Sequence, residues 1–359
     1  MGTEMRKIDS GKELMRAVVY RGPQNLQIEE VPIPEIRADE MLIKVRSATT
    51  CGTDVKTYLR GHPKYPPPFQ FGHEFAGDIV DVGPMVENLK AGMRVTASCF
   101  GPCGACYPCK HHQENLCENM AYNFGTYAEF VRLTGPFVRW NTLVIPENLS
   151  YPQAALLEPL ASVVHGHKLL NIRAGEKVAI LGGGGAIGLM HLQLAKASGA
   201  AETIAADLVD ERLEFATKLG ASRVFNPGQA DLREAILEMT GGRGVDVAIE
   251  CAGTKQTWEA ATQIVRKGGR VLWFGGLRGG TTVELDAAAI HYGEITLYNT
   301  HGNAPADFWE ACNLVAAGIV DTRYLLSGEM PLEQTEEALK MMIAGKAMKI
   351  SINPEMRVE

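Results

Sequence analysis

Apolar runs that end in glycine turns and lead into amphipathic segments recur through the second half of the chain. The first is VAIL, followed by GGGG and by a segment with apolar residues at Ile187, Met190, Leu194 and Ala197. Spacings of three and four residues predict a helix. The runs ETIAAD, GVDVAIECAG and RVLWFGG follow, with the helical pattern TWEAATQIVRKGG between the last two. Alternating strands and helices predict a parallel sheet with crossover helices, an α/β fold.

The first half of the chain has a different pattern. Short strand-like runs bounded by glycine and proline begin at Met15, in MRAVVY, whereas residues 1–14 are polar and of mixed charge. A chain of 359 residues exceeds what one hydrophobic core usually supports, so we expect two domains. We expect residues 1–14 to be an N-terminal extension, 15–160 a mostly β domain, 161–300 the α/β domain and 301–359 a return to the first domain.

The amino-acid composition limits the kinds of molecule that the protein is expected to bind. Apolar residues make up 46% of the chain and charged residues 21%, as in ordinary globular proteins, and the net charge is −7. This acidic balance argues against nucleic acid or an anionic membrane as partner. No uncharged apolar run approaches the roughly 18 residues of a membrane span, and the N-terminus has no signal-peptide pattern. We therefore expect a cytoplasmic protein that acts on a small molecule.

Five of the eight cysteines lie within residues 99–117. Four of them form a C-x2-C-x2-C-x7-C pattern among glycine, proline and polar residues: Cys103, Cys106, Cys109 and Cys117. This spacing lets the chain wrap one zinc ion with four thiolates, which leaves no position for substrate and predicts a structural zinc. The alternatives are unrelated thiols, or a zinc ribbon that binds a partner. We expect Cys99, outside the pattern, to be a core residue.

A second pattern predicts a dinucleotide site. Gly183, Gly185 and Gly188 fit G-x-G-x-x-G after a strand and before a helix. The glycines allow a tight turn, close approach of the pyrophosphate and close helix packing, and the helix N-terminus faces the negative charge. Asp207 ends the next strand, about twenty residues on. An acidic side chain there accepts hydrogen bonds from ribose hydroxyls and repels a 2′-phosphate, so we expect NAD rather than NADP.

Two upstream segments carry further metal-binding residue types. CGTDVK places Cys51 beside Thr53 and Asp54, and FGHEFAG places His73 beside Glu74. Neither segment is specific by itself, since a single cysteine is often a buried small hydrophobe and a single histidine a satisfied polar residue.

The order of these motifs resembles the zinc-containing medium-chain dehydrogenases, from about Met15 to near the C-terminus. The resemblance implies that Cys51 and His73 hold a catalytic zinc. It implies a third ligand in the EPL motif, Glu158, as in the sorbitol, other polyol and threonine dehydrogenases. Glu74 is then an exchangeable fourth ligand or a close neighbour, which makes two zinc ions per chain.

The residue types suit this chemistry. Three protein ligands leave one zinc position open, where an alcohol can lose its proton and then a hydride. Asp54 either hydrogen-bonds the free nitrogen of His73 or caps a helix. Thr53 is expected to take the alcohol proton. Many relatives have a histidine where this chain has Lys56, so the proton relay ends at Lys56, His62 or water.

The resemblance also implies an architecture. The first domain is expected to be a chaperonin-10-like β-rich barrel and the second a Rossmann domain, with the active site in the cleft between them. Gly253 and Gly275 are expected to end strands at the coenzyme edge. Arg212 lies near the adenine or pairs with nearby acids. The set of expected coenzyme residues is completed by Ile187 and Thr300. Relatives pair across a two-fold axis, which implies a homodimer or homotetramer.

The sequence leaves several alcohols open as the substrate. Glu158 favours polyols, sugar alcohols and related secondary alcohols, but mammalian-type sorbitol dehydrogenases carry an Arg-Tyr pair where this chain has NTHGN. An L-threonine 3-dehydrogenase-like enzyme, or another alcohol dehydrogenase, is the alternative within the class. A non-catalytic protein that binds zinc and nucleotide is the alternative outside it.

Overall fold

The computed structural model describes residues 13–62 and 64–358, which form two compact units. Unit 1 comprises residues up to Pro159 together with Ala304–Cys312 and Leu325–Glu359, and unit 2 comprises Leu160–Asn303 and Asn313–Tyr324. The segment 301–359, expected to belong wholly to the first domain, thus contributes residues 301–303 and Asn313–Tyr324 to unit 2. None of the helices in the described ranges is long and apolar enough to span a membrane.

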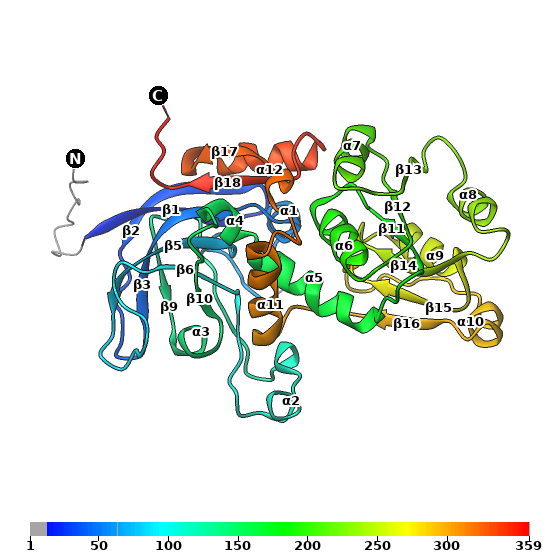
Figure 1. Ribbon diagram of the computed structural model, residues 1–359. Coiled ribbons are helices and arrows are strands. Elements are labelled where there is room, and N and C mark those ends of the chain that lie inside the picture. Colours follow the sequence, from blue (N-terminus) through cyan, green and yellow to red (C-terminus); the bar gives the residue numbers. More distant parts are fainter. Residues whose placement is uncertain (1–12, 63, 359) are drawn as a thin grey trace. The chain divides into compact units, whose positions relative to one another are not determined.

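Unit 1 is built mainly from short strands (Figure 1). Its strands are β1 (Leu14–Gly22), β2 (Asn25–Pro32), β3 (Met41–Thr49), β4 (Phe69–Gln70), β5 (Phe75–Val82), β6 (Arg94–Ala97), β7 (Phe100–Gly101), β8 (Ala121–Tyr122), β9 (Phe130–Leu133), β10 (Thr142–Val144), β17 (Leu326–Pro331) and β18 (Lys349–Asn353). Its helices are α1 (Gly52–Arg60), α2 (Tyr107–Lys110), α3 (Gly135–Trp140), α4 (Tyr151–Ala155) and α12 (Thr335–Ile343). Two further helices, α5 (Leu157–Leu170) and α11 (Pro305–Ala316), begin in unit 1 and end in unit 2.

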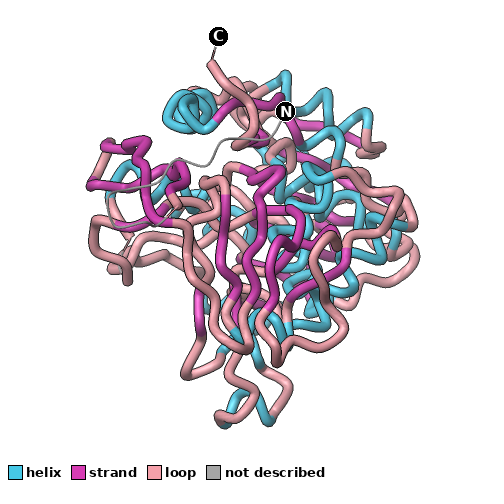
Figure 2. Tube along the Cα trace, turned by 90° about the vertical axis from the view of Figure 1, so that its left-hand side faces the viewer, coloured by secondary structure: helices cyan, strands magenta, loops and turns pink. Residues whose placement is uncertain are grey.

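The largest sheet of unit 1 has the order β10-β6-β5-β3-β18-β17, and β9 also pairs with β3. In Figure 2, where all strands are magenta, several strands run alongside one another. The core of unit 1 includes Phe75 of this sheet, Tyr20 of β1, and Phe71 and Tyr127 from the segments outside the strands. Strand β18 comes from the C-terminal end of the chain and pairs with β3, with Ile352 opposite Ala48. This pairing brings C-terminal residues to the end of β3.

Unit 2 contains a six-stranded sheet in the order β13-β12-β11-β14-β15-β16, and all its strand pairs are parallel. The strands are β11 (Lys177–Leu181), β12 (Glu202–Ala206), β13 (Arg223–Phe225), β14 (Val245–Glu250), β15 (Val265–Trp273) and β16 (Thr296–Asn299). The helices are α6 (Ala186–Ala197), α7 (Asp210–Lys218), α8 (Leu232–Met239), α9 (Lys255–Gln263) and α10 (Ala287–Gly293). In chain order this is the 3-2-1-4-5-6 arrangement of a Rossmann fold. The predicted α/β class and parallel sheet are confirmed.

The turn between β11 and α6 packs against the helix that follows it. A Cβ on Gly188 would lie 2.3 Å from the carbonyl oxygen of Gly182 and 2.7 Å from the Cα of Gly183. Both of these are backbone atoms, which have no side-chain freedom to move away. Only glycine therefore lets α6 approach the turn this closely, as the sequence pattern predicts.

Replacing Gly188 by alanine is expected to destabilise the protein by about 1–3 kcal/mol, because the turn must shift to admit the methyl group. The same shift should weaken NADH binding. Thermal unfolding and NADH fluorescence titration measure the two effects. Gly279→Ala is the matched control, since nothing lies within 4 Å of a Cβ there. Equal melting temperatures for the two variants would contradict this account of the turn.

Candidate active site

Three metal-binding side chains meet at one end of β3 and β5. Cys51 lies two residues after β3 and is the N-cap of α1, and His73 and Glu74 directly precede β5. The two strands are antiparallel, with Ala48 opposite Phe75, so the end of one lies beside the start of the other. The ligand atoms of Cys51, His73 and Glu74 all lie within 4.8 Å of one another. We call these three residues the catalytic triplet.

Asp54 performs both of the functions that its position in the sequence suggests. Its Oδ2 accepts a hydrogen bond from the backbone N–H of Cys51 at 2.9 Å, within a capping box of α1. Its Oδ1 lies 3.0 Å from Nδ1 of His73. The buried Tyr127 donates its hydroxyl to Asp54 Oδ2 at 2.6 Å. With Nδ1 engaged in this way, Nε2 is the ring nitrogen of His73 that remains for a metal.

Glu74 is fully buried and paired with a lysine from a distant part of the chain. Nζ of Lys349, in β18, lies 2.9 Å and 2.8 Å from the two carboxylate oxygens, and the hydroxyl of Thr49 donates to Oε2. The same Nζ donates to the backbone oxygen of Thr50 at 2.6 Å. Burial lowers the pKa of Lys349, but the negative charges of Glu74 and Cys51 raise it more, so the net pKa is raised. The lysine therefore remains charged beside Glu74.

Glu158 lies outside the catalytic triplet. It is in the first turn of α5 and is 4% exposed. Its Oε1 accepts a hydrogen bond from the thiol of Cys99 at 3.1 Å. Among the described residues, Glu74 rather than Glu158 is grouped with Cys51 and His73. The ligand role of Glu158 stays a prediction.

The expected proton relay begins on the exposed side of α1. Thr53 and Lys56 are both exposed residues of this helix. His62 is half-buried, and its ring contacts that of Phe124, which in turn contacts the ring of His73. Burial lowers the pKa of His62. The part that each residue plays in proton transfer remains a prediction.

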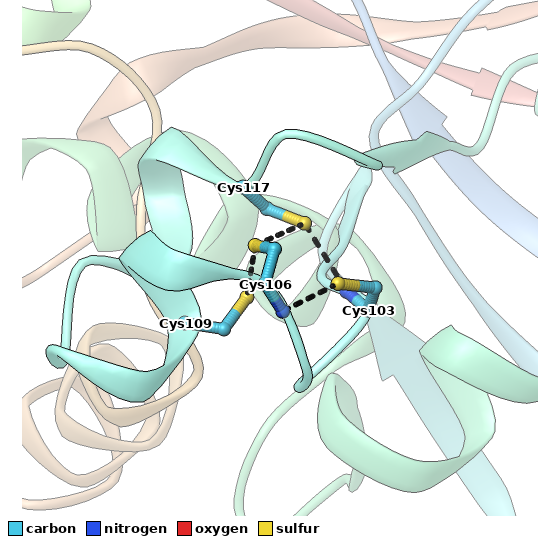
Figure 3. Close-up of side chains that lie close together, drawn as sticks. All are labelled: Cys103, Cys106, Cys109 and Cys117. Atoms are coloured by element: carbon cyan, nitrogen blue, oxygen red, sulfur yellow. Dashed lines mark hydrogen bonds between the residues drawn. The ribbon is translucent and has the colours of Figure 1, made fainter.

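The four-cysteine lobe is a separate cluster, which projects from the strands of unit 1 around α2 (Figure 1). Figure 3 shows the sulfur atoms of the four cysteines turned toward one another. All four lie within 4.8 Å of one another, the arrangement that a tetrahedral zinc site requires. The backbone N–H groups of Ala105 and Cys106 donate to the sulfur of Cys103 at 3.4 Å, and they lower its pKa to about 6. Such donors stabilise a thiolate, the form that binds metal.

The carboxyl ends of the strands in unit 2 carry the expected coenzyme residues. Gly185 caps α6, and Asp207 follows β12 directly. Asp207 accepts hydrogen bonds from the backbone N–H groups of Gly184 and Val209, each at 3.1 Å. A Cβ on Gly184 would lie 2.7 Å from Cβ of Arg212, so Arg212 is also beside this turn. β11 lies between β12 and β14, where the direction of chain progression reverses and dinucleotides bind in such sheets.

One detail of the turn differs from the sequence analysis. The sequence motif begins at Gly183, and its first glycine is the one that is expected to allow the tight turn. The residue with a left-handed backbone is instead Gly182, with φ +76°. Gly183 is restricted by packing, because a Cβ there would lie 2.8 Å from Cα of Ala205.

The other expected coenzyme residues lie in the same unit. Gly253 and Gly275 are so close that a Cβ on Gly275 would be 2.4 Å from the nitrogen of Gly253. Glu250, at the end of β14, accepts a hydrogen bond from that nitrogen at 2.7 Å. The buried hydroxyl of Thr300 has no hydrogen-bond partner in the described part of the chain, and its contact with the coenzyme stays a prediction.

Four residues of the site were missed by the sequence analysis: Thr49, Cys99, Tyr127 and Lys349. Cys99 was expected, but as a core residue. Lys349 had one available signal, since it is a charged residue at the start of an apolar strand, KISIN. A buried lysine needs a buried partner, and this pattern could have pointed to Glu74 or Glu158.

Comparison with known proteins identifies the family of the chain. Residues 37–140 match the alcohol dehydrogenase GroES-like domain, and residues 186–317 match the zinc-binding dehydrogenase family. Sorbitol dehydrogenase of Bacillus subtilis is 35% identical over 95% of this chain and 97% of its own. L-threonine 3-dehydrogenase of Bacillus licheniformis is 31% identical over 95% of this chain and 99% of its own.

A solved structure is similar over almost the whole length of both chains. A zinc-binding dehydrogenase of Sinorhizobium meliloti, bound to NADP, superimposes with a TM-score of 0.88 at 33% identity, over 95% of this chain and 99% of that one. The expected chaperonin-10-like first domain is confirmed by the GroES-like match. The chain therefore belongs to the zinc-containing medium-chain alcohol dehydrogenases and is an oxidoreductase that uses zinc and a nicotinamide coenzyme.

Proposed function

We propose that the protein transfers a hydride between a secondary alcohol of the polyol class and NAD, at a zinc ion held by the catalytic triplet. The observation that carries the proposal is the meeting of Cys51, His73 and Glu74 within 4.8 Å. One thiolate, one imidazole and one carboxylate form a donor set of the catalytic rather than the structural type, because three protein ligands leave a position for substrate. Zinc there would make the alcohol more acidic and favour loss of hydride from its carbon.

The residues around the triplet orient its side chains and compensate their charge. Asp54 fixes the ring of His73 through Nδ1, and Tyr127 holds Asp54 in turn. Lys349 compensates the charge of Glu74. We assign to Thr53 a relay function: its hydroxyl would accept the alcohol proton while donating its own proton onward, to solvent directly or by way of Lys56 or His62.

We assign a second zinc ion to the four-cysteine lobe. Because four thiolates fill a tetrahedral site, this ion has no position for substrate and serves to stabilise the lobe. The test is Cys106→Ser, which is expected to lower zinc content from about two to about one per chain and to lower the melting temperature. Elemental analysis and calorimetry measure these changes. A variant that keeps its full zinc content and stability would contradict a structural zinc here. Cys312→Ser, a buried cysteine outside both clusters, is the control.

We propose NAD as the coenzyme because of Asp207. Its carboxylate is held at the coenzyme edge by two backbone N–H groups, where it would accept from ribose hydroxyls and repel a 2′-phosphate. The Sinorhizobium meliloti relative, in contrast, was solved with NADP.

Asp207→Ser is expected to weaken NAD binding by about 30-fold, the equivalent of one charged hydrogen bond of about 2 kcal/mol. NADP binding should improve, since the like charge is removed. Michaelis constants for both coenzymes measure the change. The exposed Glu238→Gln, in the same unit, controls for general charge. A parent enzyme that already prefers NADP would refute the assignment.

We propose a polyol substrate on the basis of the similarity to sorbitol dehydrogenase. L-threonine is the second candidate, because a threonine dehydrogenase is similar over the same length. The test is the rise of absorbance at 340 nm when zinc-loaded protein and NAD meet linear polyols, inositols, sugars, diols and threonine. Oxidation of one polyol configuration supports the proposal. If threonine alone is oxidised, the substrate is the amino alcohol and not a polyol. If no compound raises the absorbance at 340 nm, both candidates are refuted.

We also propose a homodimer or homotetramer. β16 is an edge strand of the six-stranded sheet, so one row of its backbone groups is open to a strand from a second copy. Light scattering on the purified protein measures the assembly directly.

A further inference from the structure

Glu250 is a buried acidic residue that the proposed reaction does not use. It ends β14 and has no solvent-exposed surface. Burial raises its pKa, and hydrogen bonds from the hydroxyl of Thr257 and from nearby backbone N–H groups lower the pKa in part. A carboxyl group buried in this way costs free energy unless hydrogen-bond donors satisfy it. Its donors therefore show which parts of the chain Glu250 holds in place.

Two hydrogen bonds meet at one oxygen of this side chain. Oε1 accepts from the backbone N–H of Gly253 at 2.7 Å and from the hydroxyl of Thr257 at 2.6 Å. Gly253 has a left-handed backbone, with φ +68°. Thr257 lies in the first turn of α9 and forms a capping box with the N-cap residue Thr254. One atom thus fixes both the loop 251–254 and the start of α9.

The loop 251–254 is packed between two other segments at the coenzyme edge of the sheet. On one side, a Cβ on Gly182 of the glycine turn would lie 2.9 Å from the nitrogen of Ala252. On the other side, a Cβ on Gly275 would lie 2.4 Å from the nitrogen of Gly253 and 2.8 Å from Oε2 of Glu250. Three backbone segments therefore meet above Glu250, and a shift of the loop would disturb the surface on which a coenzyme rests.

We propose that Glu250 is a positioning residue for the coenzyme, because its Oε1 holds the loop 251–254 in place between the glycine turn and the end of β15. The inference rests on the proposed function, since it assumes that NAD binds at this edge of the sheet. A side chain without exposed surface acts through the loop and not by contact with the coenzyme. The competing explanation is that Glu250 contributes to stability alone.

Two substitutions at Glu250 test the hydrogen bonds to Oε1. Glu250→Met has a similar length but no such acceptor, whereas Glu250→Gln keeps an oxygen. In Glu250→Met the dissociation constant of NADH and the Michaelis constant for NAD should rise about 10-fold, because two hydrogen bonds that fix the loop are lost. With saturating NAD, kcat and the Michaelis constant for the alcohol should change less than about twofold, because the catalytic triplet belongs to unit 1. Glu250→Gln should recover most of the NADH affinity.

Asp246→Asn provides a control at the opposite end of the same strand. Asp246 accepts hydrogen bonds from the backbone N–H of Lys177 at 2.7 Å and from Nε of Arg266 at 2.6 Å. Its substitution should lower the melting temperature, as Glu250→Met should, but should leave NADH affinity at the parental value. NADH fluorescence titrations well below both melting temperatures separate loss of stability from loss of coenzyme positioning.

A second pair of variants applies if Glu250→Met does not fold. Thr257→Val removes the hydroxyl that donates to Oε1, and Thr257→Ser keeps it. Thr257→Val should raise the dissociation constant of NADH about 3-fold, since one of the two hydrogen bonds remains, and Thr257→Ser should bind like the parent.

The same titrations show which part of the account fails. Parental NADH affinity in Glu250→Met, or in Thr257→Val where the former does not fold, would overturn the positioning role. Equal weakening in Asp246→Asn, or no recovery in Glu250→Gln, would also overturn it. In all these cases the parent still binds NADH, so the proposed function stands. A parent protein that binds no NADH would refute the proposed function and this inference together.

Discussion

Cys51→Ala is expected to lower kcat by about 10³-fold, equivalent to about 4 kcal/mol of lost transition-state stabilisation. The triplet contains a single thiolate, and without it His73 and Glu74 are too few to keep a metal in the geometry that catalysis needs. NADH binding should be unchanged, because the glycine turn and Asp207 belong to unit 2. Single-turnover rates, zinc content and NADH fluorescence measure the three quantities.

Cys312→Ala is the matched control for this substitution. Cys312 is also buried in unit 1, but it belongs to neither metal-binding cluster of the described residues. It should keep its zinc content and its rate. If Cys51→Ala oxidised alcohols at the parental rate, the triplet would have no part in catalysis.

Lys349→Met is expected to destabilise the metal-free protein by about 3–5 kcal/mol, because it leaves the fully buried carboxylate of Glu74 without its charge partner. The loss of the bond to the oxygen of Thr50 adds to the cost. Adding Glu74→Gln should recover much of the stability, since no uncompensated charge then remains. Urea unfolding of the chelator-treated proteins measures the difference.

The contrast with a surface ion pair provides the control for Lys349. Nζ of Lys177 lies 2.7 Å from Glu202, and these side chains are 31% and 28% exposed. Lys177→Met should therefore cost less than about 1 kcal/mol. Equal losses in the two variants would mean that burial of the Glu74–Lys349 pair has no energetic consequence.

Much of the fold could be predicted from local sequence. The glycine turn, Asp207 and the alternation of apolar runs with helical patterns predict a parallel sheet, since each signal lies within about thirty residues. The register of unit 1 could not be predicted in this way. Its strands are short, and its main sheet joins β3 to β18 across about three hundred residues.

The residues of the site also differ in how far they could be predicted, depending on how close in sequence their partners lie. The lobe was predicted because its four cysteines are close in sequence, and the resemblance supplied Cys51 and His73. Lys349 and Cys99 were missed as partners of Glu74 and Glu158, because they are separated from them by 275 and 59 residues. Such contacts depend on tertiary packing, which no local pattern records. Both Glu74 and Glu158 were expected near the metal; the geometry groups Glu74 with Cys51 and His73, and the ligand role of Glu158 stays a prediction.

The most direct test follows the hydride itself. The polyol that the substrate screen identifies is labelled with deuterium at the carbon that becomes the carbonyl, and NADH formed by chelator-treated and zinc-restored protein is analysed by NMR. The account predicts one deuterium at C4 of the nicotinamide per turnover with the zinc-restored protein and no transfer without zinc. Deuterium released to solvent, or transfer that continues undiminished in the metal-free protein, would contradict zinc-dependent hydride transfer.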